Sequence, residues 1–202
     1  MKIIKLLYHK VFVVIVGVFV LSFGGAQENT VTRFNNLPVI KPFFDDYWML
    51  VEDLSFEING GEIIVPEGFV TDLASIPDFA KSVYDKFGRY APAGIVHDYL
   101  YWTQVCTKDE ADEILRDALK SIGVGFGARN SIRRAVDKFG KKAWKENIKW
   151  KEDGFPRIIP QEKRNYPIGV KWKDYAKGLR DSITTNDSQT PVERADYCEF
   201  TD

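Results

Sequence analysis

The hydrophobic positions of this chain fall into three zones, and the first is a short apolar run near the N-terminus. Three lysines among the first ten residues precede an uncharged run from Val11 to Phe23, and Gly24-Gly25-Ala26 follows it. This order of basic start, short apolar core and small residues is typical of a secretory signal peptide. It predicts a signal peptide at residues 1–26 and export to the periplasm or the medium. An uncleaved membrane anchor is the alternative, although the run is short for a membrane span.

The second zone begins with patterns that favour strands. Residues 27–44 are polar and then interrupted by prolines, which indicates an extended lead-in. The run from Tyr47 to Ile58 is rich in aromatic and aliphatic residues, partly alternates, and ends at the turn sequence Asn59-Gly60-Gly61. Because residues 62–66 are again mostly apolar, the pattern predicts a β-hairpin, with residues 68–72 extending or following its second strand.

Four helical patterns follow the hairpin. They cover residues 77–87, 92–104, 108–122 and 130–150. Pro77 and Gly88 bound the first helix, Thr107 is a suitable N-cap for the third, and Gly140 weakens the middle of the fourth. The sequence therefore predicts an α+β fold, with a small antiparallel hairpin or sheet followed by a bundle of about four helices.

The third zone, beyond Trp150, has no clear periodicity. It contains several prolines and a polar run at residues 184–190, which are typical of loops. One short helix is predicted near Lys173 to Ser182. We therefore expect one domain at residues 45–150 and an irregular, loop-rich C-terminal extension at residues 151–202.

Charge and cysteine content narrow the class of protein. Removal of residues 1–26 takes away three lysines and no acids, so 28 basic and 29 acidic residues become 25 and 29, a net charge of about −4. This balance argues against a nucleic-acid-binding protein. Cys106 and Cys198 are the only cysteines, and an oxidising compartment would permit a disulfide that ties the extension to the domain. The alternative is one buried and one free thiol.

Beyond the signal sequence the chain has one histidine, His97, which is followed directly by Asp98. In a helix, His97 and Tyr101 share a face, whereas Asp98 points about 100° away. Asp112 lies at the margin of the apolar face of the next predicted helix, so it needs a partner, and His97 and Tyr101 are the expected donors. A neutral His97 oriented by Asp112 would act as a general base toward water.

Two other interpretations of His97 stay open. A hydrogen bond to Asp112 could be purely structural, and the ring could instead bind a transition metal. Zinc is disfavoured, because no second histidine and no suitably spaced cysteine accompanies His97. Asp98 and Asp72 are candidate ligands for a hard cation such as calcium, which would offset charge on a tetrahedral oxyanion. In the alternative interpretation, Asp72 caps a turn or helix and Asp98 pairs with Arg89 or a lysine.

Several stretches of the sequence resemble a known family. They are Gly68–Pro77, Ala93–Tyr101, Lys108–Asp112 and Phe139–Trp144. In this order they resemble DUF1353, a bacterial and phage family of unknown function, over roughly residues 45–150. The resemblance implies no established activity.

A second resemblance carries chemistry. The pattern His97-Asp98-x-x-Tyr101 with the later Asp112 is similar to the catalytic helices of secreted phospholipases A2. This similarity implies that His97 activates a water and that Asp98 helps to hold calcium, with Asp72 in place of an upstream loop aspartate found in bacterial members. The chain departs from that family because it lacks the family's disulfide framework and a glycine-rich calcium loop.

Two functions follow from these patterns. The first is an exported hydrolase of lipid esters, with His97, Asp112 and Tyr101 as the catalytic group. The second is a non-catalytic envelope or phage-derived interaction module, in which the same residues form a buried polar network and the protein partner is unidentified. The segment from Arg129 to Lys151 has nine basic residues, so it either lies on an anionic membrane surface or packs its apolar stripe into the core.

Overall fold

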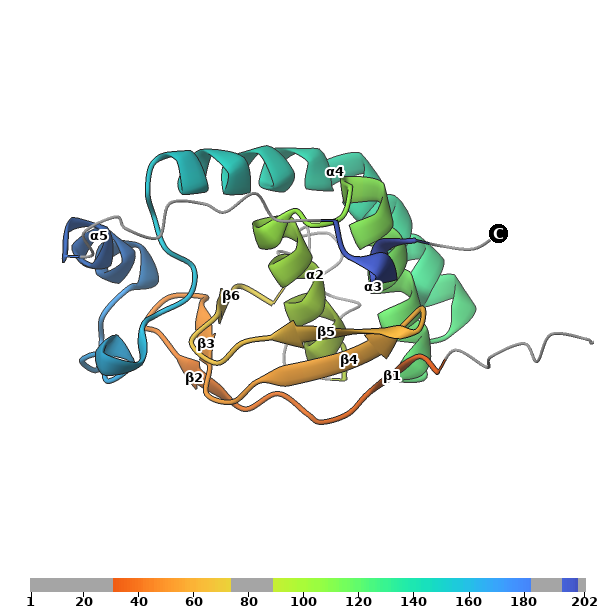
Figure 1. Cartoon of the computed structure of the whole chain (residues 1–202), viewed down its shortest axis with the longest axis horizontal. Coiled ribbons are helices and arrows are strands. Elements are labelled where there is room, and N and C mark those ends of the chain that lie inside the picture. The colour runs from red at the N-terminus through yellow and green to blue at the C-terminus, as the bar shows by residue number, and fades with distance from the viewer. Residues whose placement is uncertain (1–30, 74–88, 183–193, 200–202) are drawn as a thin grey trace, which may run out of the picture.

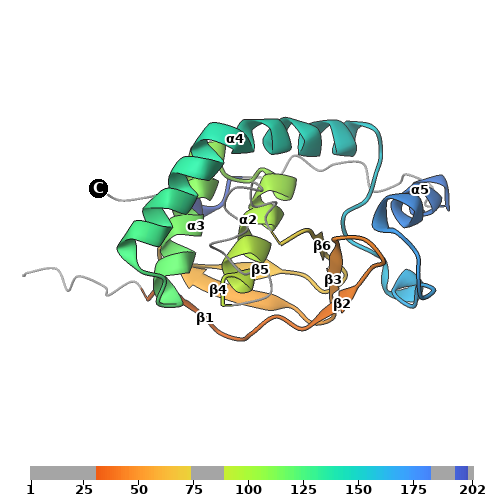
Figure 2. The same cartoon turned by 180° about the vertical axis from the view of Figure 1, so that it is seen from behind.

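The computed structural model describes residues 31–73, 89–182 and 194–199, which form an α+β fold of two small antiparallel sheets covered by helices (Figures 1 and 2). The predicted fold class is therefore confirmed. The predicted signal peptide at residues 1–26 and the predicted helix at residues 77–87 lie outside the described residues. None of the described helices has the length and apolar character needed to span a bilayer.

Each sheet has three strands. The first contains β1 (Arg33–Phe34), β4 (Leu54–Ile58) and β5 (Gly61–Val65), in the order β1-β4-β5. The second contains β2 (Ile40–Pro42), β3 (Trp48–Leu50) and β6 (Val70–Thr71), in the order β2-β3-β6. Strands β4 and β5 form the predicted hairpin, and the positive φ angles of Asn59 and Gly60, 51° and 75°, suit its tight turn.

The apolar run from Tyr47 to Ile58 is not one strand, as predicted, but two strands in different sheets. β3 ends at Leu50, and β4 begins at Leu54. The break is held by Asp53, whose Oδ1 accepts a hydrogen bond of 2.7 Å from the Glu67 amide. β6 follows the hairpin and pairs antiparallel with β3, which places it in the second sheet.

The helices follow the predicted pattern closely. They are α2 (Ala91–Thr103), α3 (Lys108–Ser121), α4 (Phe126–Glu152) and α5 (Trp172–Ser182). Thr107 caps α3 in a capping box with Glu110. α4 begins at Phe126 rather than at the predicted Asn130. Gly125 is its N-cap, and Gly127, which resembles a loop residue in sequence, lies in its first turn. Figures 1 and 2 show α4 bending part-way, with its second half reaching toward α5.

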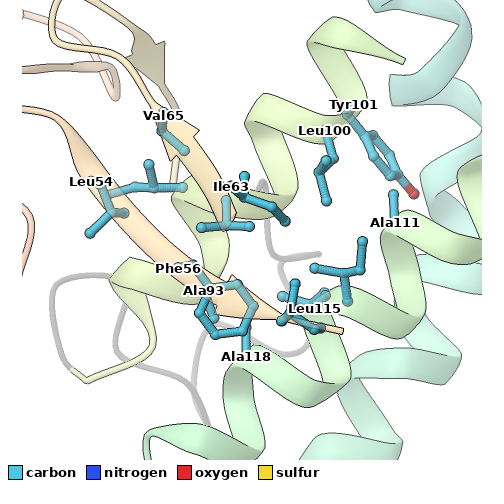
Figure 3. Close-up of a cluster of buried hydrophobic side chains, with 14 of the residues drawn as sticks. Leu54, Phe56, Ile63, Val65, Ala93, Leu100, Tyr101, Ala111, Leu115 and Ala118 are labelled. Atoms are coloured by element: carbon cyan, nitrogen blue, oxygen red, sulfur yellow. The ribbon is translucent and has the colours of Figure 1, made fainter. Parts of the chain in front are cut away.

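The main core lies between the first sheet and helices α2 and α3 (Figure 3). Alternate residues of β4 and β5 point into it, as the strand pattern requires: Leu54, Phe56, Ile58, Ile63 and Val65 are all buried. α2 is buried around most of its circumference, so its few polar side chains, His97 and Asp98, are enclosed by other elements. A second core forms where α5 and the preceding segment cover β2, β3 and β6, and Trp172 is fully buried in it.

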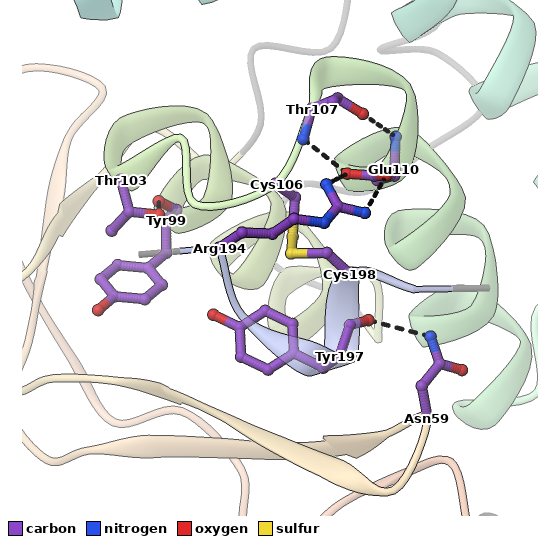
Figure 4. Close-up of a disulfide and its surroundings, with 9 residues drawn as sticks. All are labelled: Asn59, Tyr99, Thr103, Cys106, Thr107, Glu110, Arg194, Tyr197 and Cys198. Atoms are coloured by element: carbon purple, nitrogen blue, oxygen red, sulfur yellow. Dashed lines mark hydrogen bonds and ion pairs between the residues drawn. A yellow bond between two sulfur atoms is a disulfide. The ribbon is translucent and has the colours of Figure 1, made fainter. Parts of the chain in front are cut away.

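A disulfide joins Cys106 to Cys198 across 92 residues, which confirms one of the two sequence alternatives (Figure 4). It holds the short 3₁₀ helix Asp196–Cys198 against the connection between α2 and α3. Two further contacts fix this end of the chain. Arg194 forms a bidentate pair with Glu110, and the Asn59 side chain donates to the Tyr197 carbonyl.

Candidate functional site

The polar centre of the helical layer is Asp112, whose side chain is fully buried. Its Oδ1 lies 2.9 Å from His97 Nε2 and accepts a hydrogen bond of 2.7 Å from the Tyr101 hydroxyl. Its Oδ2 accepts a hydrogen bond of 2.7 Å from Lys108 Nζ. The structure thus brings together the three residues that the sequence suggested as a catalytic group, and it adds Lys108.

Two helices position this group. His97 and Tyr101 lie one turn apart on α2, and their rings contact each other with centroids 4.1 Å apart. Asp112 lies in the second turn of α3, the helix whose start is fixed by the Thr107 cap. Lys108 reaches Asp112 from one turn earlier on α3, an i,i+4 spacing that is visible in the sequence.

The charge of Asp112 is stabilised by its donors. Burial raises the pKa of Asp112, but hydrogen bonds from His97, Lys108 and Tyr101 outweigh burial and leave this pKa below its ordinary value. Burial and the Asp112 charge raise the pKa of Tyr101, so its hydroxyl remains a donor. Asp112 is therefore an anion that accepts a hydrogen bond from the nearest ring nitrogen of His97.

This arrangement fixes the tautomer of a neutral His97. An ionised Asp112 can only accept, so Nε2 carries the proton and Nδ1 keeps its lone pair. Among the residues that the structure describes, Nδ1 has no hydrogen-bond partner. A lone pair on an oriented imidazole is the feature that a general base requires.

His97 lines a cavity of about 640 Å³. Asp98, Asp72 and Tyr101 line the same cavity, whereas Asp112 lies behind His97 and does not reach it. The rest of the lining includes Asn147 and Trp150 of α4, Arg157 of the segment after it, and Trp172, the first residue of α5. His97 is only 4 % exposed, so little of its surface meets this cavity.

Asp98 and Asp72 are the predicted cation ligands. The Oδ2 of Asp98 accepts a hydrogen bond of 2.5 Å from the Thr71 hydroxyl on β6, and Asp72 directly follows that strand. In the described part of the chain, the groups of three side chains close enough to share a metal are Cys106–Glu110–Cys198 and Asp109–Asp112–Asp137. The first contains the disulfide, and the second contains the aspartate bound to Lys108. A cation held by Asp98 and Asp72 would thus need main-chain or water oxygens as well, and it stays a prediction.

Gly140 on α4 completes the packing around Tyr101. A Cβ at position 140 would overlap the Tyr101 hydroxyl, which cannot move freely because it is bonded to Asp112. The sequence suggested only that Gly140 weakens the helix. The structure gives the reason for a glycine here, since the α4 backbone approaches α2 too closely for a side chain.

Replacement of Gly140 with alanine is expected to destabilise the protein by about 1–3 kcal/mol, the usual effect of overpacking. The clash should outweigh the better helix propensity of alanine, which is about 1 kcal/mol. Gly127→Ala on the same helix is the matched control, because an added Cβ meets nothing within 4 Å there. Urea unfolding measures both variants, and equal stability of the two would contradict the packing argument.

The lowered pKa of Asp112 predicts acid sensitivity. Because the folded-state value lies below the unfolded one, ionised Asp112 stabilises the fold above its unfolded pKa, and this contribution is lost as pH falls through the folded pKa. Unfolding free energy should therefore drop below about pH 4. The Asp112→Asn variant should be less stable than the wild type at neutral pH. Its free energy of unfolding should also fall less as the pH is lowered. Asp174→Asn, an exposed change on α5, should lose stability in acid as the wild type does.

Part of the chain is similar to a known family. Residues 48–136 match the family model DUF1353, described as a protein of unknown function. The DUF1353 region runs from β3 into the first half of α4, so it contains His97, Asp98, Tyr101, Lys108 and Asp112. The other lining residues, Tyr47 and those from Phe139 to Lys173, lie outside the DUF1353 region. No curated protein and no solved structure matches the chain.

Proposed function

We propose that this chain is an exported hydrolase that cleaves ester bonds, with His97 as the base that activates water. The observation that carries the proposal is the orientation of His97. Its Nε2 contacts a buried carboxylate, and the residue lines a cavity large enough for a small substrate group. The N-terminal signal pattern supports export.

Each residue has a defined part in this reaction. His97 Nδ1 removes a proton from water as the water oxygen bonds to the ester carbonyl carbon. The carbonyl electrons move onto oxygen and then return, and the leaving alkoxide takes the proton back from the imidazolium. Asp112 stabilises the imidazolium and holds its ring orientation, as an orienting carboxylate does in other hydrolases. Tyr101 and Lys108 hold Asp112 in place.

Lipid esters are the proposed substrates, and two features support this class. The first is the resemblance of the His97-Asp98-x-x-Tyr101 pattern and Asp112 to secreted phospholipases A2. The second is a row of exposed basic residues on α4, which are Arg134, Lys138, Lys141, Lys145 and Lys149. They fall within an arc of about 80° on a regular helix, and none has an acidic partner within 4 Å in the described residues. Such a row is attracted to anionic lipid surfaces.

Calcium is the cation that the proposal assigns to Asp98 and Asp72. A ligand that binds only the folded state raises stability, by about 2.7 kcal/mol at one hundred times its Kd. We therefore expect calcium to raise the melting temperature of the wild type and to have little effect on Asp98→Asn. Asp153→Asn, an exposed change on the same cavity, should respond as the wild type does. A calcium response that persists in Asp98→Asn would place the cation elsewhere.

The second candidate function is a non-catalytic interaction module. The observation in its favour is that His97 is 4 % exposed and every polar atom of Asp112 is bonded, as in a structural network. The two functions are separated by incubating the purified chain and calcium with phospholipid vesicles and a panel of soluble esters. Release of fatty acid that depends on His97 supports the hydrolase. No release from any substrate supports the module.

A further inference from the structure

Arg157 lines the cavity from the segment beyond the DUF1353 region, and its guanidinium is fixed without a carboxylate partner among the described residues. Its Nε donates to the Val70 carbonyl at 2.8 Å, and its Nη1 donates to Asn147 Oδ1 at 2.9 Å. No carboxylate of the described residues lies within 4 Å of this guanidinium. The Nη2 of Arg157 has no hydrogen-bond acceptor among the described residues. An arginine held on one edge presents its other edge for a planar or tetrahedral anion.

Asn147 is the residue that orients Arg157. It is the one residue of α4 that is classed as buried, and its Nδ2 donates to the Ala143 carbonyl at 3.0 Å. This bond directs Oδ1 toward the guanidinium. The cavity side of α4 thus supplies a fixed acceptor for Arg157 rather than a charged partner.

Arg157 is close in the fold to the candidate catalytic residues. Val70, which accepts from Arg157 Nε, also donates its amide to the Arg157 carbonyl at 2.9 Å. The next residue, Thr71, donates to Asp98, which is adjacent to His97. The pKa of Tyr47 is raised to about 12, mainly by burial and next by the negative charge of Asp72, whereas the positive charge of Arg157 lowers it. Tyr47 therefore lies near both the acidic and the basic parts of the cavity, and its hydroxyl stays protonated.

Lys173 supplies a second cation on this part of the wall. It is exposed, lies in the first turn of α5 and lines the cavity. The residue before it, Trp172, is fully buried in the second core and so fixes the start of α5.

We propose that Arg157 and Lys173, which line the same cavity, form a subsite for a phosphate group of the substrate. The proposal rests on the proposed function, because it places the phosphate in the cavity that His97 shares. It assigns ester cleavage to His97 and recognition of the phosphate to the segment beyond the DUF1353 region. The cavity also has carboxylates, namely Asp72, Asp98, Glu146 and Asp153, of which Glu146 pairs with Lys142 at 3.7 Å.

The first probe is inorganic phosphate, and its binding to the purified chain is measured by calorimetry and by thermal shift. Wild type should bind phosphate saturably, and Arg157→Gln should weaken binding at least about tenfold, the usual loss for one charge-assisted hydrogen bond. Lys173→Gln, which removes the second cation of the subsite, should also weaken it. Arg180→Gln on α5 removes the same charge outside the cavity and should bind as the wild type does. Equal binding by Arg157→Gln and wild type overturns the proposal.

Chemical modification tests the subsite without a variant, in case Arg157→Gln fails to fold. Phenylglyoxal modifies accessible arginines, and the modified peptides are identified by mass spectrometry. Phosphate should slow the modification of Arg157 and leave that of Arg180 unchanged. Modification of Arg157 at the same rate with and without phosphate would contradict the subsite.

Two further experiments are needed. One identifies the molecule that carries the phosphate, and the other distinguishes failure of the subsite from failure of the proposed hydrolase function. Phosphatidylcholine vesicles that contain phosphatidic acid are compared with phosphatidylcholine vesicles that contain the same amount of diacylglycerol, so the phosphomonoester is the only head-group difference. If the chain binds the vesicles with phosphatidic acid and this binding depends on Arg157, the ligand is a lipid head group. If only the binding of inorganic phosphate depends on Arg157, the ligand is a soluble phosphate ester. His97→Ala should keep phosphate binding. Loss of hydrolysis therefore tests His97, whereas loss of phosphate binding tests Arg157.

Discussion

Replacement of His97 with alanine is expected to lower ester turnover by about 100- to 10,000-fold, the usual contribution of a positioned general base. The loss should appear in kcat, because the base acts in the transition state rather than in substrate binding. Folding should change little, because Asp112 keeps its bonds from Tyr101 and Lys108. The loss of one hydrogen bond accounts for about 1 kcal/mol.

Two controls make this result specific to His97. Added imidazole should restore part of the activity of His97→Ala, since the cavity gives a small base access to the vacated space. Tyr101→Phe removes one bond to Asp112 and should reduce turnover far less. If His97→Ala instead unfolds several kcal/mol more easily and the wild type shows no turnover, the buried network is structural and the hydrolase is wrong.

Removal of the Cys106–Cys198 disulfide is expected to have the largest effect on stability. It closes a loop of 92 residues, and the chain-entropy relation for such a loop gives about 4 to 5 kcal/mol. The double variant Cys106→Ser/Cys198→Ser avoids free thiols, and urea unfolding with and without a reductant measures the difference. Wild type under reducing conditions should match the double variant.

The disulfide also bears on the candidate site. Cys106 immediately precedes Thr107, the N-cap of α3, and α3 carries both Lys108 and Asp112. Loosening this connection should therefore lower turnover as well as stability. Arg194→Gln is the control, because it removes the exposed pair with Glu110 and leaves the covalent link intact. If the cysteine double variant were as stable as Arg194→Gln, the disulfide would contribute little to the free energy of unfolding.

Local patterns were sufficient to predict much of the fold and the centre of the site. Helical spacing placed His97 and Tyr101 on one face, and the apolar stripe of α3 placed Asp112 at a buried margin, so their contact followed from periodicity. Lys108 was missed although its spacing of four residues from Asp112 was available. That signal is weak, because most such pairs lie on solvated faces.

Other features depend on distant parts of the chain and leave no local signal. Residues 47–58 are divided between two sheets at a break between Leu50 and Leu54. At this break the Glu67 amide donates a hydrogen bond to the Asp53 side chain. Arg157 lies in a segment without periodicity, and its orientation depends on Asn147 and on the carbonyl of Val70, 87 residues earlier. The need for glycine at position 140 follows from the path of another helix.

The two walls of the cavity come from different parts of the sequence, and this has an evolutionary consequence. The residues proposed to move the proton lie within the DUF1353 region, whereas Arg157 and Lys173 lie beyond it. A relative that kept the proposed residues but had a different downstream segment would combine the same reactive centre with a different binding surface. Substrate choice could then diverge through exchange of the downstream segment, while the chemistry stayed unchanged.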